Sequence, residues 1–128
     1  MQPPIPEEAR RLISAHIPTV PHLEALVLAR SDPARAWSAS ELADRLYIRS
    51  ETAASILADL MQSGLLASAS IDPMTARYAT ANATVDAAVS QLAEFYAHQV
   101  VEVTRLIHAH DVSAVQRLAD AFRLGRRR

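Results

Sequence analysis

The stretch that decides the fold runs from residue 38 to residue 66 and reads SASELADRLYIRSETAASILADLMQSGLL. Its first four residues, Ser38–Glu41, have the capping-box spacing, in which a serine and a glutamate each satisfy a free backbone donor at a helix start. Apolar residues then recur every three or four positions, as in an amphipathic helix. After a break at residues 47–49, Ser50 is expected to cap a second helix, and Gly64 suits the left-handed residue that ends it. The stretch therefore predicts two short helices joined by a tight turn.

A short β-hairpin is expected to follow these two helices. Residues 65–71 alternate small apolar residues with serines, and residues 76–80 read ARYAT. Asp72-Pro73 lies between the two segments, and this dipeptide is typical of a turn between strands. Together, the helix pair and the hairpin predict a winged helix-turn-helix domain over residues 21–80.

Further helices are expected on both sides of this domain. Residues 1–20 begin with a proline-containing arm and continue as a helix with one apolar stripe. Residues 81–128 are expected to form a helix of about 27 residues with a long apolar seam, and then a final helix over residues 112–124 before the basic tail Arg126–Arg128. The seam residues follow one another at steps of three and four, and they are Val85, Val89, Leu92, Tyr96, Val100, Val103 and Ile107.

An apolar seam of this length needs a partner to cover it. That partner is either the N-terminal helix of the same chain or the equivalent helix of a second subunit. We expect the second arrangement, so residues 81–128 are assigned to the dimerisation region of a homodimer.

The composition of the 128-residue chain limits the possible fold and function. Half of the residues are hydrophobic, aromatic residues make up 5%, and only two glycines are present, which favours a mostly α fold with a small β-hairpin wing. The absence of cysteine excludes disulfides, thiolate zinc sites and cysteine nucleophiles. No segment approaches the roughly 18 apolar residues of a membrane span, so we expect a cytoplasmic protein. A glycine-rich phosphate loop and a nucleophile elbow are also missing, so we expect neither enzymatic activity nor a cofactor.

The stretch from Glu41 to Leu66 resembles the helix-turn-helix of bacterial winged-helix regulators, most closely the MarR-like group, and residues 77–80 resemble the return strand of their wing. The resemblance implies a dimeric regulator of transcription whose second motif helix enters the major groove of double-stranded DNA. In this reading three arginines hold the DNA backbone, and Thr52 and Ser55 approach the bases. The implied DNA-binding residues are Arg45, Arg49, Ser50, Thr52, Ser55 and Arg77.

The sequence departs from this pattern in its charge and in its base-reading residues. Acids outnumber arginines by seven to five between residues 21 and 80, whereas a DNA-binding domain usually has a basic face. No arginine, lysine, asparagine or glutamine lies between Ser50 and Met61, and the carboxylates of Glu51 and Asp59 would repel phosphate. These departures favour contacts to the DNA backbone over sequence-specific contacts.

An alternative function is a protein–protein interaction module that has kept the winged-helix fold and lost base reading. Its docking surface would contain Ile56 with Ala54 and Ala58 on the second motif helix. Ile56 could equally complete the core, because it lies beside the expected core residue Leu57. The sequence leaves both readings of Ile56 open.

The sequence also contains a spacing that could bind a metal ion and an unusual residue in the turn. Glu94, His98 and Glu102 are spaced four apart, which could supply metal ligands, but this spacing is also common on solvated helices, and we expect no metal site. Tyr47 lies where such turns frequently place glycine. This position predicts either a strained turn or a local geometry that differs from that of the family.

Overall fold

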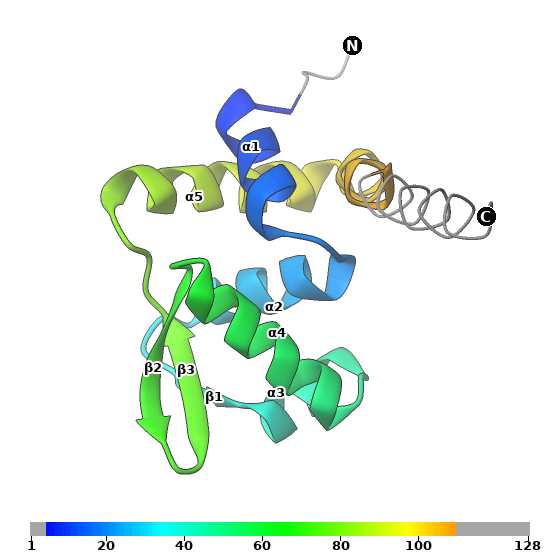
Figure 1. Cartoon of the computed structure of the whole chain (residues 1–128). Helices are drawn as coiled ribbons and strands as arrows, with labels where there is room; N and C mark the ends of the chain where they lie inside the picture. Colours follow the sequence, from blue (N-terminus) through cyan, green and yellow to red (C-terminus); the bar gives the residue numbers. More distant parts are fainter. Residues whose placement is uncertain (1–4, 110–128) are drawn as a thin grey trace, which may run out of the picture.

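The computed structural model describes residues 5–109, with the helix-turn-helix beside a small sheet and α5 lying across α1 (Figure 1). The elements are α1 (Glu7–His16), α2 (Val20–Ser31), β1 (Trp37–Ser38), α3 (Ala39–Leu46), α4 (Ser50–Gln62), β2 (Leu66–Ile71), β3 (Met74–Tyr78) and α5 (Ala83–His98). Residues 100–109 are also helical. The prediction of a mostly α fold with a β-hairpin wing is confirmed. The expected helix over residues 112–124 and the basic tail lie outside the described residues.

The start of the helix-turn-helix forms as its local sequence predicts. The Ser38 hydroxyl oxygen accepts a hydrogen bond from the Glu41 backbone N–H at 3.1 Å, and the Glu41 carboxylate accepts one from the Ser38 backbone N–H at the same distance. The second of these bonds lowers the pKa of Glu41, because it stabilises the charged carboxylate. The prediction that Ser50 caps α4 is wrong. Arg49 is the N-cap residue without a side-chain cap, and Ser50 is the first helical residue.

Tyr47 ends α3 in the left-handed conformation, with φ 57° and ψ 45°. The backbone N–H groups of Tyr47 and Ile48 both donate to the carbonyl oxygen of Ala43, which satisfies the end of the helix. For a residue with a Cβ atom this conformation costs about 1–2 kcal/mol. The predicted strained turn is therefore present.

The three strands form an antiparallel sheet in the order β1-β3-β2. Trp37 pairs with Ala76, and Leu66 pairs with Tyr78. Ala76 is buried and its neighbour Arg77 is exposed. Successive side chains of a strand point to opposite faces, so Arg77 projects from the outer face of the wing.

Ile56 is part of the hydrophobic core, with 2% of its surface exposed. It packs in one cluster with the neighbouring buried residues of α4, which are Ala53, Leu57 and Leu60. The docking surface centred on Ile56 is therefore contradicted, because a side chain already covered by its own chain cannot contact a partner.

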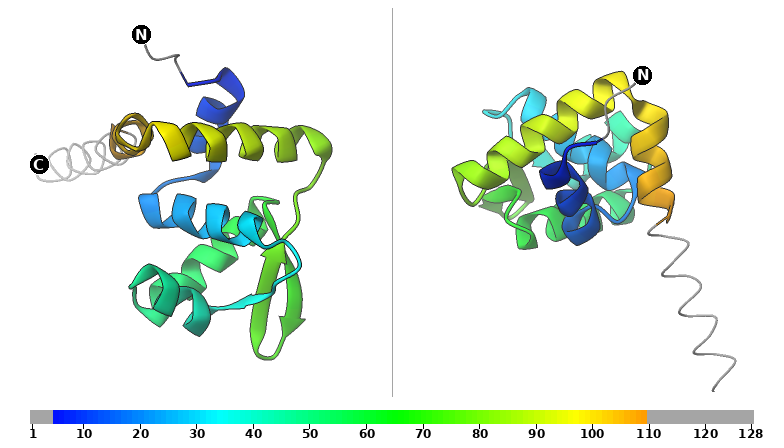
Figure 2. Two further views of the ribbon diagram at one scale, coloured as in Figure 1. Left: turned by 180° about the vertical axis from the view of Figure 1, so that it is seen from behind. Right: turned by 90° about the horizontal axis from the view of Figure 1, so that it is seen from above.

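The single helix of about 27 residues expected after the wing is also wrong. α5 ends at His98, Gln99 leaves the helical conformation with φ −138° and ψ 59°, and the helix over residues 100–109 then runs in a different direction (Figure 2). The predicted seam is thus divided between two helices.

Four of the seven seam residues are buried inside the chain itself. Val89, Leu92, Val103 and Ile107 are each at most 1% exposed and belong to the main core cluster. The expectation that these four form a dimer interface is corrected, because the chain's own packing already covers them. α1 packs against α5, which is the alternative that the sequence left open.

In the described part of the chain, no single helix is both long and apolar enough to cross a membrane. α1 and α2 meet those criteria only as a pair bent by 116°.

Candidate nucleic-acid interface

The outward face of α4 carries the side chains that the sequence assigned to DNA. The inward residues of α4 are fully buried, whereas Thr52, Ser55 and Ala58 are exposed. α4 runs along the front of the molecule in Figure 1, with the wing beside it. This face is therefore open to a partner.

Four of the six predicted DNA-binding residues lie together at the beginning of α4. Arg49, Ser50, Thr52 and Ser55 are all exposed within about one and a half turns of helix. An Arg49 guanidinium nitrogen lies 3.1 Å from a carboxylate oxygen of Glu51, and both side chains are more than three-quarters exposed. Such an exposed ion pair contributes little, so Arg49 can exchange Glu51 for a phosphate.

Arg45 lies on the side of α3 that faces α2. With Glu24, Ser31 and Tyr96, among others, it lines a cleft of about 300 Å³. Its guanidinium carbon is also 5.5 Å from the centre of the Trp37 ring. Arg45 is exposed, and its described contacts are with this cleft and the Trp37 ring.

A second arginine, Arg35, also packs on the Trp37 ring, and the sequence did not indicate this contact. Arg35 stacks 3.7 Å above this ring and forms an ion pair with Glu41 at 3.3 Å. The indole N–H of Trp37 is buried without a hydrogen-bond partner among the described residues. Arg35 precedes Trp37 by two residues, but no sequence signal indicated that its side chain would fold back over the ring.

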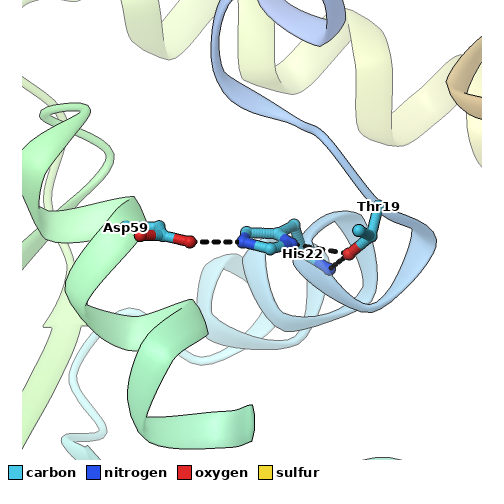
Figure 3. Close-up of polar contacts among 3 residues, drawn as sticks. All are labelled: Thr19, His22 and Asp59. Atoms are coloured by element: carbon cyan, nitrogen blue, oxygen red, sulfur yellow. Dashed lines mark hydrogen bonds and ion pairs between the residues drawn. The ribbon is translucent and has the colours of Figure 1, made fainter. Parts of the chain in front are cut away.

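Asp59 of α4 is tied to the beginning of α2 through His22 (Figure 3). Nε2 of His22 lies 2.9 Å from the Asp59 carboxylate, and Nδ1 lies 2.6 Å from the Thr19 hydroxyl oxygen. His22 is 7% exposed. In the neutral tautomer that satisfies all three groups, Nε2–H donates to Asp59 and the Thr19 hydroxyl donates to Nδ1. The carboxylate expected to repel phosphate is therefore engaged within the protein.

We expect Asp59→Ala to lower the free energy of unfolding by about 1–2 kcal/mol, because it leaves the buried His22 N–H without its acceptor. The control is Gln62→Ala, an exposed and uncharged change on the same helix, which should stay within about 0.5 kcal/mol of the wild type. Urea denaturation followed by circular dichroism measures both. Equal stabilities for the two variants would contradict a structural role for the His22–Asp59 contact.

Hydrogen bonds join α5 to the return strand of the wing and to α2. The Tyr78 hydroxyl donates to the Asp86 carboxylate at 2.5 Å, and Arg30 of α2 donates to the Ser90 hydroxyl oxygen at 3.0 Å. Burial, followed by the neighbouring carboxylate, raises the pKa of Tyr78, so this phenol stays protonated and able to donate. The first contact joins the wing to α5, and the second joins α2 to α5.

The residues considered for a metal site do not converge. The described residues contain no group of three histidine, cysteine, aspartate or glutamate side chains placed to hold a metal ion. The break at Gln99 places His98 and Glu102 on two different helices.

These elements define a winged helix-turn-helix protein with additional helices before and after the domain. No protein-family model matches the sequence, and no curated protein is significantly similar to it. Among solved structures, the chain is similar to the crystal structure of the multiple antibiotic-resistance repressor (MarR) from Listeria monocytogenes 4b F2365. The two are 17% identical, with a TM-score of 0.49, and the match covers 91% of this chain and 80% of the other.

Proposed function

We propose that this protein is a cytoplasmic, dimeric regulator of transcription that binds double-stranded DNA through α4 and the wing. The observation that carries the proposal is the exposed polar group at the beginning of α4, formed by Arg49, Ser50, Thr52 and Ser55. In a winged helix-turn-helix the beginning of this helix is the part that reaches furthest into the major groove.

The two acidic residues of α4 differ in how strongly they oppose DNA binding in the folded chain. Glu51 is paired with Arg49, and Asp59 is paired with His22. Asp59 is held by His22 away from the beginning of α4, whereas Glu51 becomes unpaired when Arg49 turns to a phosphate and then opposes binding. Arg77 on the wing makes no ion pair among the described residues, so its charge is available to a phosphate.

Binding of this kind depends mainly on contacts to the phosphate backbone of the DNA. Thr52 and Ser55 carry short hydroxyl side chains that hydrogen-bond to several bases without strong discrimination. Arg49 and Arg77 supply the phosphate contacts, and the exposed Arg45 is a further candidate. We therefore propose binding with modest sequence preference and a marked dependence on salt concentration.

The dimer is proposed on the apolar surface that the chain does not cover. Of the seam residues, Val85 and Tyr96 are half-buried and Val100 is 48% exposed, and the neighbouring Val101 is 62% exposed. Val85 lies at the beginning of α5, whereas Tyr96, Val100 and Val101 lie at or just beyond its end, so a second copy packed at that end would cover the last three side chains.

The test is binding of the full chain to a mixed pool of genomic duplex fragments at low and moderate salt. We expect Arg49→Glu combined with Arg77→Glu to weaken binding at least roughly tenfold, because two phosphate contacts become repulsive. The control, Arg10→Glu with Arg11→Glu, makes the same change in net charge at exposed residues of α1, away from the beginning of α4, the wing and the proposed dimer surface.

Salt-sensitive binding that survives in the control and is lost in the first double variant would support the proposal and its contact face. Equal losses in both would mean that only net charge matters. Absence of binding by the folded wild-type chain at low salt would overturn the proposal.

A further inference from the structure

Tyr47 lies in the turn of the helix-turn-helix, and its side chain is almost completely exposed. It is 94% exposed, the largest exposed fraction among the large hydrophobic residues of the described chain. It is also the one residue other than glycine with a positive φ in that part of the chain. An aromatic ring therefore stands in solvent at a position that disfavours any side chain.

A smaller residue at position 47 would adopt this backbone conformation at least as easily. Glycine adopts a φ of 57° without steric conflict, and asparagine tolerates it better than a bulky residue does. The hydrogen bonds that end α3 use only the backbone of Tyr47 and of Ile48, so they do not depend on the ring. The phenol thus contributes neither packing nor a side-chain contact that would offset the strain.

The position of Tyr47 indicates what the ring can contact. It lies in the turn that leads into α4, two residues before Arg49 and three before Ser50. Its neighbours at this end of α4 are exposed polar and cationic residues, whereas the central aromatic residue of a protein interface is usually enclosed by a packed apolar surface. A tyrosine hydroxyl beside arginines is suited to a backbone phosphate, because tyrosine is among the side chains that donate to phosphate oxygens.

We propose that Tyr47 is a DNA-contacting residue, which donates its hydroxyl to a backbone phosphate at the edge of the groove that α4 enters. The inference rests on the proposed function and adds to it a neutral contact. Binding then depends on the phenol as well as on arginines, which compensates in part for the small number of basic residues on this face.

The experiment measures binding of Tyr47→Asn and Tyr47→Phe in the full chain, with the same duplex fragments and salt series. We expect Tyr47→Phe to weaken binding at least roughly threefold, because the hydrogen bond to the phosphate is lost, and Tyr47→Asn to weaken it roughly fivefold to tenfold, because the ring is lost as well. The thermal midpoint should be unchanged in Tyr47→Phe, and unchanged or higher in Tyr47→Asn, because asparagine relieves the strained conformation.

The salt dependence separates this contact from the charged ones. A neutral donor releases no counterion, so the slope of log K against log salt should be the same in both Tyr47 variants as in the wild type, whereas it should decrease in Arg49→Glu/Arg77→Glu.

Two results would overturn the inference while leaving DNA binding in place: wild-type affinity in Tyr47→Phe, which lacks only the hydroxyl, or a clearly lower thermal midpoint in Tyr47→Asn, which would give the ring a role in the fold. Loss of binding in the arginine variant alone would then show that the proposed function stands without Tyr47. Failure of the folded wild-type chain to bind DNA would overturn both proposals.

Discussion

Replacing Ile56 by alanine is expected to lower the free energy of unfolding by about 2–5 kcal/mol, the range for a buried aliphatic side chain truncated to alanine. Ile56 is 2% exposed and packs with Leu57 and Leu60 in the main core. Truncation removes buried apolar surface and leaves a cavity beneath α4. Urea denaturation followed by circular dichroism measures the change.

The matched control is Ser55→Ala, one residue earlier on the exposed face of the same helix. Its stability should stay within about 0.5 kcal/mol of the wild type, since no buried contact is lost. The two variants also separate function from folding, because Ser55→Ala removes a proposed base contact. A loss below about 1 kcal/mol in Ile56→Ala would contradict its place in the core.

Replacing Leu92 by alanine should cost a similar amount, about 2–5 kcal/mol. Leu92 is fully buried within one chain, in the middle of α5. Its burial does not require a second subunit, so the loss should persist when the protein is diluted. Urea denaturation at two protein concentrations tests this, with sedimentation velocity reporting the oligomeric state.

Val101→Ala is the control for Leu92→Ala, because this side chain is 62% exposed beyond the break at Gln99. It should leave the stability of the folded chain nearly unchanged, and any effect should appear as weaker association. If Leu92→Ala instead shifted the protein to monomers without loss of stability, the burial of Leu92 within one chain would be contradicted.

The candidate site was predicted best where its residues are neighbours in the sequence. Arg49, Ser50, Thr52 and Ser55 share one helix start, so helical periodicity alone places them together. The orientation of Arg45 toward α2 depends on how α3 packs, which periodicity does not report. The sequence indicates that Tyr47 occupies a turn position where glycine is frequent, but only the structure shows that its ring is exposed.

Contacts between distant segments could not be derived from the sequence. His22 and Asp59 are 37 residues apart, and nothing in either neighbourhood indicates that α2 brings the imidazole to α4. Ile56 presented a related difficulty. It lies at one edge of the apolar stripe of α4, where the pattern alone does not say how far the neighbouring elements reach.

The sequence by itself determined the elements whose signals are local. The capping box at Ser38–Glu41 fixes the beginning of α3, and Asp72-Pro73 marks the turn of the wing, because these signals act over a few residues. The tertiary structure alone decided which surface covers the long apolar seam. Periodicity shows that Leu92 and Val103 must be buried but not by what, since the hydrophobic effect is non-directional and favours any apolar partner. The chain breaks its helix at Gln99, and both side chains join its own core.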